Sequence, residues 1–143
     1  METNFEAIVV TQEFKVSPEI LWETITNHEI MLKWYFDNIP DFQAQVGFET
    51  RFNVVSGERN FMHIWKVTEV IPLKRIVYNW TFDDYEGSAD LSMEIYDEND
   101  HTRLVVTDTI LESFPQDIPE FKRESAVAGW QYFINQRLKN FLS

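Results

Sequence analysis

Apolar and polar residues alternate with a period of two over most of the stretch from residue 48 to residue 111. Phe48, Thr50, Phe52 and Val54 alternate with polar neighbours, which is the pattern of a β-strand with one buried and one solvated face. Similar segments follow, and a short turn separates each from the next. We therefore predict an antiparallel meander, with strands at residues 48–54, 61–71, 75–82, 89–95 and 102–111.

The segment before the meander predicts one more strand and two short helices. Residues 5–15 are rich in β-branched and apolar residues, as a strand would be. Ser17-Pro18-Glu19 has the form of a helix start. The Ser side chain accepts from a free backbone N–H, Pro fixes the first helical φ, and Glu favours the positive end of the helix dipole. A second short helix is expected at residues 27–33.

The C-terminal segment changes to a helical period. Asp117-Ile118-Pro119-Glu120 predicts an N-cap with its carboxylate partner three residues on. About 25 helical residues are expected to follow. At 100° per residue one apolar stripe forms, and its members are Val127, Trp130, Ile134, Leu138 and Phe141. Such a stripe has the width needed to lie across a sheet.

Length, charge and composition exclude several classes of protein. A chain of 143 residues predicts a single domain over residues 1–143. The absence of cysteine excludes disulfides and thiolate chemistry. A formal net charge of -12 repels phosphates and anionic headgroups, so neither nucleic acid nor a membrane is expected as a partner. With no secretory pattern at the N-terminus and no apolar run near the roughly 20 residues of a membrane span, we expect a cytoplasmic protein. The oligomeric state is left open.

Four segments in order carry a family resemblance: residues 14–22 (FKVSPEILW), 32–35 (LKWY), 70–80 (VIPLKRIVYNW) and Gly129-Trp130. They resemble the homologues of the C-terminal domain of the heat-shock-protein-90 ATPase activator, which belong to the START-like (SRPBCC) superfamily. The resemblance implies an α+β helix-grip fold. In that fold a curved antiparallel sheet of about six to seven strands wraps round a long C-terminal helix, and two short helices follow strand one. It also implies a chaperone partner and a role in the stress response.

A concave sheet closed by a helix leaves a cavity between them, and such sites are mostly apolar with a few polar groups. Large aromatic residues suit the wall, because Tyr and Trp combine a broad apolar face with one hydrogen-bonding group. The alternative is that the same residues fill the interior as close-packed core. The apolar candidates for the cavity wall are Trp34, Phe52, Trp65, Tyr78, Trp80, Val127 and Trp130.

Arg123 is the most informative polar residue, because the helical wheel places it on the apolar stripe. A charged group there is expensive unless it has a partner. Two interpretations stay open. Arg123 either anchors a ligand carboxylate at the mouth of the cavity or pairs with Glu120, Glu124 or a carboxylate of the sheet.

Two further polar residues are candidates for the cavity. Asp108 shares strand parity with apolar neighbours and so projects inward, where it would have a raised pKa or a cationic partner; the alternative is exposure at a frayed strand end. His63 lies in the middle of a strand and would form an acid–base pair with Tyr78 or Asp108. The alternative for His63 is a structural histidine with its own hydrogen bond.

These candidates lead to three hypotheses about function. The first is a binding protein, not an enzyme, that holds a small hydrophobic or amphipathic molecule between the sheet and the C-terminal helix. The second is a chaperone-associated interaction module, and the third is an enzyme similar to a polyketide cyclase that uses His63, Tyr78 or Asp108. No cofactor and no metal are expected, since the three histidines have no ligand spacing and no phosphate-binding loop occurs.

Overall fold

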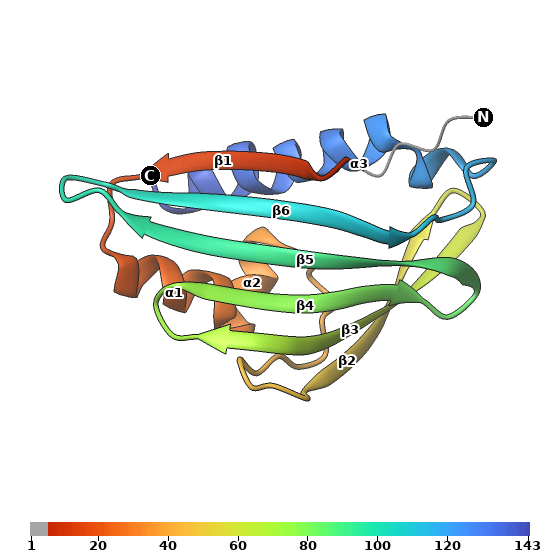
Figure 1. Cartoon of the computed structure of the whole chain (residues 1–143), viewed down its shortest axis with the longest axis horizontal. Coiled ribbons are helices and arrows are strands. Elements are labelled where there is room, and N and C mark those ends of the chain that lie inside the picture. The colour runs from red at the N-terminus through yellow and green to blue at the C-terminus, as the bar shows by residue number, and fades with distance from the viewer. Residues whose placement is uncertain (1–5) are drawn as a thin grey trace.

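The computed structural model describes residues 6–143, and it contains one antiparallel sheet with helices on one side (Figure 1). The spatial order of the strands is β1-β6-β5-β4-β3-β2. The meander and the α+β helix-grip fold are therefore confirmed; Phe5, expected to open the first strand, lies outside the described residues. The strands are β1 (Ile8–Phe14), β2 (Glu49–Ser56), β3 (Arg59–Ile71), β4 (Arg75–Phe82), β5 (Tyr85–Asp97) and β6 (Thr102–Glu112).

Two short helices, α1 (Pro18–Thr26) and α2 (His28–Trp34), follow β1 as predicted. The Ser17 hydroxyl accepts a hydrogen bond from the backbone N–H of Ile20 at 3.2 Å, and Pro18 occupies the first turn. Asn27 ends α1 and caps α2, because its side chain accepts from the backbone N–H of Ile30. The capping residues in the sequence thus place both helix starts.

The C-terminal helix starts later than the sequence predicts. A single 3₁₀ turn, η1 (Pro119–Phe121), is followed by Lys122 in an extended conformation, and the long helix begins only with α3 (Arg123–Trp130). Glu120 does not complete the expected capping box. Its carboxylate accepts a hydrogen bond from Ser56 at 2.7 Å and forms an ion pair with Arg59. These contacts tie the turn to the β2–β3 hairpin and override the local capping signal.

The same helix widens after Trp130. The segment η2 (Gln131–Leu138) is π-helical, and α4 (Lys139–Phe141) completes the chain's last helix. Because hydrogen bonds in a π-helix join residues five apart, the apolar side chains do not follow a regular wheel. Ile134 and Leu138 are completely buried, whereas Phe141 is 40% exposed. The prediction that Phe141 belongs to the buried stripe is therefore wrong.

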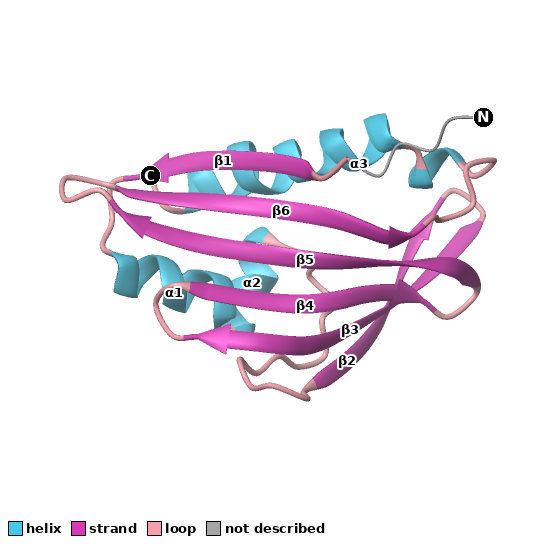
Figure 2. Ribbon diagram, viewed as in Figure 1, coloured by secondary structure: helices cyan, strands magenta, loops and turns pink. Residues whose placement is uncertain are grey.

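Polar side chains of this helix fasten it to the outer edge of β1. The Asn135 amide donates to the carbonyl of Thr11 at 2.9 Å, and Lys139 donates to the carbonyl of Glu13 at 3.2 Å. Figure 2 shows the helix running alongside β1 over the length of the strand. The bonds satisfy carbonyls at a strand edge that has no neighbouring strand.

Aromatic rings fill the part of the concave face next to α2. Trp34 and Tyr35 stack with ring centroids 4.5 Å apart, and Tyr35 lies 5.3 Å from Trp65. Trp65 in turn contacts Tyr78 at 4.8 Å. All four side chains are at most 2% exposed, so this end of the sheet is closely packed core.

Because the π-helical segment buries Ile134 and leaves Phe141 partly exposed, truncating these two residues should lower stability to different degrees. Ile134→Ala removes a fully buried side chain and should lower the free energy of unfolding by about 2–5 kcal/mol. Phe141→Ala is the matched control and should change it by about 0.5 kcal/mol or less. Urea denaturation followed by tryptophan fluorescence measures both. Equal losses of unfolding free energy in the two variants would contradict the burial of Ile134 and the exposure of Phe141 described above.

Candidate functional site

A cavity of about 850 Å³ lies between the concave face of the sheet and α3, away from the packed aromatic end. The β2–β3 hairpin, the end of β6 and the segment leading into α3 converge there (Figure 2). Small-molecule sites in proteins usually measure about 300–1,000 Å³. Eight aromatic side chains dominate the wall, and they are Phe36, Phe61, Phe82, Phe114, Phe121, Phe133, Trp80 and Trp130.

The cavity brings together five of the residues predicted from the sequence: His63, Trp80, Asp108, Arg123 and Trp130 all line it. The other five lie elsewhere. Four of these are buried in the core, and Val127 is partly buried and packs against that core. The four core residues are Trp34, Phe52, Trp65 and Tyr78.

Sequence reasoning missed the phenylalanines of the wall. Phenylalanine carries no directed polar group, so its residue type alone gives no sign that it faces a cavity. One local signal exists at Gly87, whose φ of +117° is a conformation that side chains rarely adopt. A Cβ atom at Gly87 would lie 2.3 Å from the ring of Phe114. Glycine at this position therefore lets Phe114 lie against the β4–β5 turn as part of the wall.

Asp108 lies inside β6, where it pairs with Ile8 of β1 and Leu91 of β5. It is half-buried and not at a frayed end. One carboxylate oxygen, Oδ2, accepts a hydrogen bond from the indole N–H of Trp130 at 3.1 Å. Burial raises the pKa of Asp108, and the Trp130 hydrogen bond and the charge of Arg123 oppose that rise. The cavity therefore contains a carboxylate whose charge is only partly compensated.

His63 comes from the middle of β3 and is only 6% exposed. Its Nδ1 atom lies 2.9 Å from the backbone carbonyl of Phe61, and because a carbonyl only accepts, Nδ1 carries the proton. The ring stacks on Phe52 with centroids 4.9 Å apart. Burial lowers the pKa of His63 to about 4, although the bond to Phe61 opposes this. His63 is thus a neutral imidazole at neutral pH.

Arg123 forms no ion pair with Glu120 or Glu124, and its role as a ligand anchor stays a prediction. Its guanidinium donates to the backbone carbonyls of Glu6 and Ala7, at 2.5 and 3.3 Å. It binds the start of β1 to the start of α3, at the cavity wall and close enough to Asp108 for the two charges to interact. Its charge is accommodated mainly by backbone carbonyls, which the helical wheel could not reveal.

The three residues considered as acid–base groups do not pair with one another. Tyr78 shares a hydrogen bond of 2.9 Å with the hydroxyl of Tyr35, deep in the core. Burial raises the pKa of both tyrosines. His63 bonds to a backbone carbonyl and Asp108 to Trp130. Among residues 6–143 the cavity therefore lacks the hydrogen-bonded acid–base pair on which the enzyme hypothesis depended.

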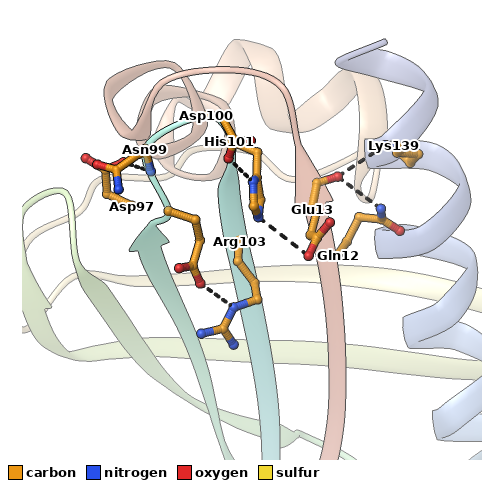
Figure 3. A network of polar contacts seen from close by, with 9 residues as sticks. Gln12, Glu13, Asp97, Asn99, Asp100, His101, Arg103 and Lys139 are labelled. Atoms are coloured by element: carbon orange, nitrogen blue, oxygen red, sulfur yellow. Dashed lines mark hydrogen bonds and ion pairs between the residues drawn. The ribbon is translucent and has the colours of Figure 1, made fainter.

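A second polar cluster lies at the β5–β6 turn, at the opposite end of the sheet from the cavity (Figure 3). His101 contacts Asp100 at 2.7 Å and Glu13 of β1 at 3.5 Å. The hydrogen bond to Asp100 raises the pKa of His101. Over the described part of the chain no group of three or more His, Asp or Glu side chains is arranged to hold a metal.

Fold and cavity define a class: a helix-grip domain of the START-like superfamily with an aromatic cavity under its C-terminal helix. The family model described as "Activator of Hsp90 ATPase homolog 1-like protein" matches residues 15–143. The chain therefore belongs to this family. A comparison with curated proteins finds no match. Nor does any helix within residues 6–143 have the length and apolar character required to cross a membrane.

Solved structures share the fold at low sequence identity. A protein from Chromobacterium violaceum superposes with a TM-score of 0.79 and 18% identity, covering 95% of this chain and 96% of its own. The Aha1 dimer from Colwellia psychrerythraea gives 0.72 and 20%, with 96% of both chains covered. DynU16, a protein of the dynemicin biosynthetic locus, gives 0.75 and 21% over 95% of this chain. This chain spans only 46% of the length of DynU16.

The lowered pKa of His63 predicts a specific loss of stability in acid. In the unfolded chain the imidazole titrates near 6.5 and in the folded protein near 4. As pH falls between these values the unfolded chain binds the extra proton, so folding becomes less favourable. Wild type should lose up to about 3 kcal/mol more than His63→Phe between pH 6.5 and 4. Urea titrations at several pH values test this, and parallel stability curves for the two proteins would contradict it.

Proposed function

We propose that this protein binds a small, mostly apolar molecule in the cavity between the sheet and α3. The observation that carries the proposal is the cavity itself, with its volume of about 850 Å³ and its aromatic wall. Apolar surface on a ligand is removed from water when it enters such a site, and this provides the main free energy of binding. The few polar groups, Asp108 and His63 among them, would orient the ligand.

The family and its relatives support a binding role without naming a ligand. DynU16 comes from a biosynthetic locus, where small organic molecules are made and handled. In the present chain no acid–base pair faces the cavity within residues 6–143. We therefore propose carriage or sequestration of a small molecule, in the cytoplasm, and assign no reaction.

A protein partner is the second candidate, supported by the description of the family model as an Hsp90 ATPase activator homologue. The net charge of -12 favours a partner with a basic surface, whose association would weaken as salt rises. Such a role would not depend on the cavity. A variant that fills the cavity therefore distinguishes the two functions.

Gly129 provides that variant, because it lies at the cavity wall on α3 and a Cβ atom there has no atom within 4 Å. Gly129→Leu should reduce ligand binding at least about ten-fold by occupying the cavity. Stability should not fall, since replacing a mid-helix glycine is favourable by roughly 0.5–1 kcal/mol. Ala128→Leu changes the neighbouring exposed residue and serves as the matched control.

Native mass spectrometry and a thermal-shift screen of fatty acids, isoprenoids and aromatic compounds measure the effect. A ligand that binds only the folded state raises the melting temperature, and the rise grows with the logarithm of the ligand concentration once that exceeds the Kd. We expect such shifts for wild type and Ala128→Leu but not for Gly129→Leu. If Gly129→Leu responded as wild type does, the cavity would not be the binding site.

A further inference from the structure

Several hydrogen-bond donors at the cavity wall are already engaged by the protein. Both terminal nitrogens of Arg123 donate to backbone carbonyls, and the amide of Gln116 donates to two carbonyls of its own segment at 3.0 and 3.2 Å. The indole N–H of Trp130 donates to Asp108. Arg123 keeps three further N–H groups, but its charge is shared with two carbonyls and with Asp108. It is therefore a weaker anchor for a carboxylate or a phosphate than an unpaired guanidinium would be.

Apart from Glu120, whose carboxylate forms an ion pair with Arg59, two side-chain acceptors of the cavity wall lack a donor among the described residues. The Nε2 atom of His63 carries a lone pair, because the proton is on Nδ1, and no described residue donates to it. Oδ1 of Asp108 is likewise without a donor, since Trp130 bonds only Oδ2. Neither atom is among the buried polar atoms sealed off from the surroundings, and both residues line the cavity. A ligand that donates hydrogen bonds could satisfy both atoms.

The electrostatics of the cavity also disfavour an anionic ligand. The Asp108 carboxylate and the lone pair of His63 would both repel a second carboxylate. The positive charge of Arg123 lies close to Asp108 and balances part of the carboxylate's negative charge. A cationic ligand would therefore gain less binding free energy here than beside an unpaired carboxylate, and a neutral donor suits the site better. Aromatic rings surround His63, with the centroids of Phe36, Trp80 and Phe82 at 5.1, 5.3 and 4.7 Å. Asp108 has the indole of Trp130 beside it.

We infer that the ligand is a neutral, flat aromatic molecule with hydroxyl groups that donate to His63 Nε2 and Asp108 Oδ1. The inference rests on the proposed function and names the class of its ligand. Aromatic faces stack on the rings of the wall, and each hydroxyl supplies the donor that a buried acceptor otherwise lacks. Fatty acids, in which the polar group is an anion and the remainder is aliphatic, match neither feature.

Three compounds of one ring system test this: 2,6-dihydroxynaphthalene, 2,6-dimethoxynaphthalene and naphthalene-2,6-dicarboxylate. Calorimetry or quenching of tryptophan fluorescence at pH 7 gives their affinities. The diol should bind at least about ten-fold tighter than the dimethyl ether, which accepts but does not donate. The dicarboxylate should bind weakest of the three.

Two variants assign the preference to residues. His63→Phe keeps an aromatic ring but removes the acceptor, so affinity for the diol should fall about five-fold or more, with that for the ether unchanged. Asp108→Asn keeps an oxygen for Trp130, removes the negative charge and presents an amide donor, so the dicarboxylate should bind better than it binds wild type. Phe141→Ala, at an exposed position, should leave all three affinities unchanged.

The possible failures are distinguishable. Binding of all three compounds with equal affinity, or a preference for the dicarboxylate, would overturn the inference about ligand class and leave the binding function intact. An unchanged preference in His63→Phe and Asp108→Asn would overturn the assignment to these two acceptors. Binding of none of the compounds, together with no thermal shift in the broader screen, would overturn the proposed function itself.

Discussion

The irregularities of strand pairing determine where the sheet can enclose space. A β-bulge bends a strand and increases its twist, and two of the bulges fall at one end of the sheet, between Trp80 and Phe82 and between Ser88 and Ala89. Trp80, Phe82 and Ala89 all line the cavity. At that end β2 and the start of β3 run steeply across the other strands, and their hairpin comes close to the end of β6 and to the segment before α3 (Figure 1). The sheet therefore curves around a volume beneath α3 that the helix, held alongside β1, does not fill.

Fastening of the helix to β1 is the second condition for this arrangement. A strand at the edge of a sheet exposes carbonyls that could pair with another chain. Arg123, Asn135 and Lys139 donate to carbonyls along β1 and its approach. The helix thereby covers an edge and is held over the first strand. Polar side chains thus help to fix the position of the cavity roof, together with the buried Ile134 and Leu138. The inner face of the roof carries Ala126, Gly129 and Trp130.

The sequence predicted those parts of the fold and of the site that are determined by residues close together in the chain. Period-two patterning located the strands and Ser17 located the first helix start, because both act over a few residues. The prediction of where the last helix starts was wrong, because Glu120 bonds to Ser56, which is distant in the sequence. Tyr78 and Trp80 share strand parity, yet only Trp80 reaches the cavity. Tyr78 is covered by Tyr35 and Phe42. Alternation along a strand predicts which face of the sheet a side chain lies on, but not which end of that face other residues cover.

The contrast between the two ends of the concave face argues against the cavity as a packing defect. Voids in a core are destabilising, and this chain packs Trp34 and Trp65 to zero exposure a short distance away. Polar groups are costly in an apolar wall unless they are hydrogen-bonded. His63 and Asp108 nevertheless line the wall, and each has one acceptor atom to which no described residue donates. Empty volume together with unpaired acceptors fits the proposed binding function, because a ligand can supply the missing contacts and donors together.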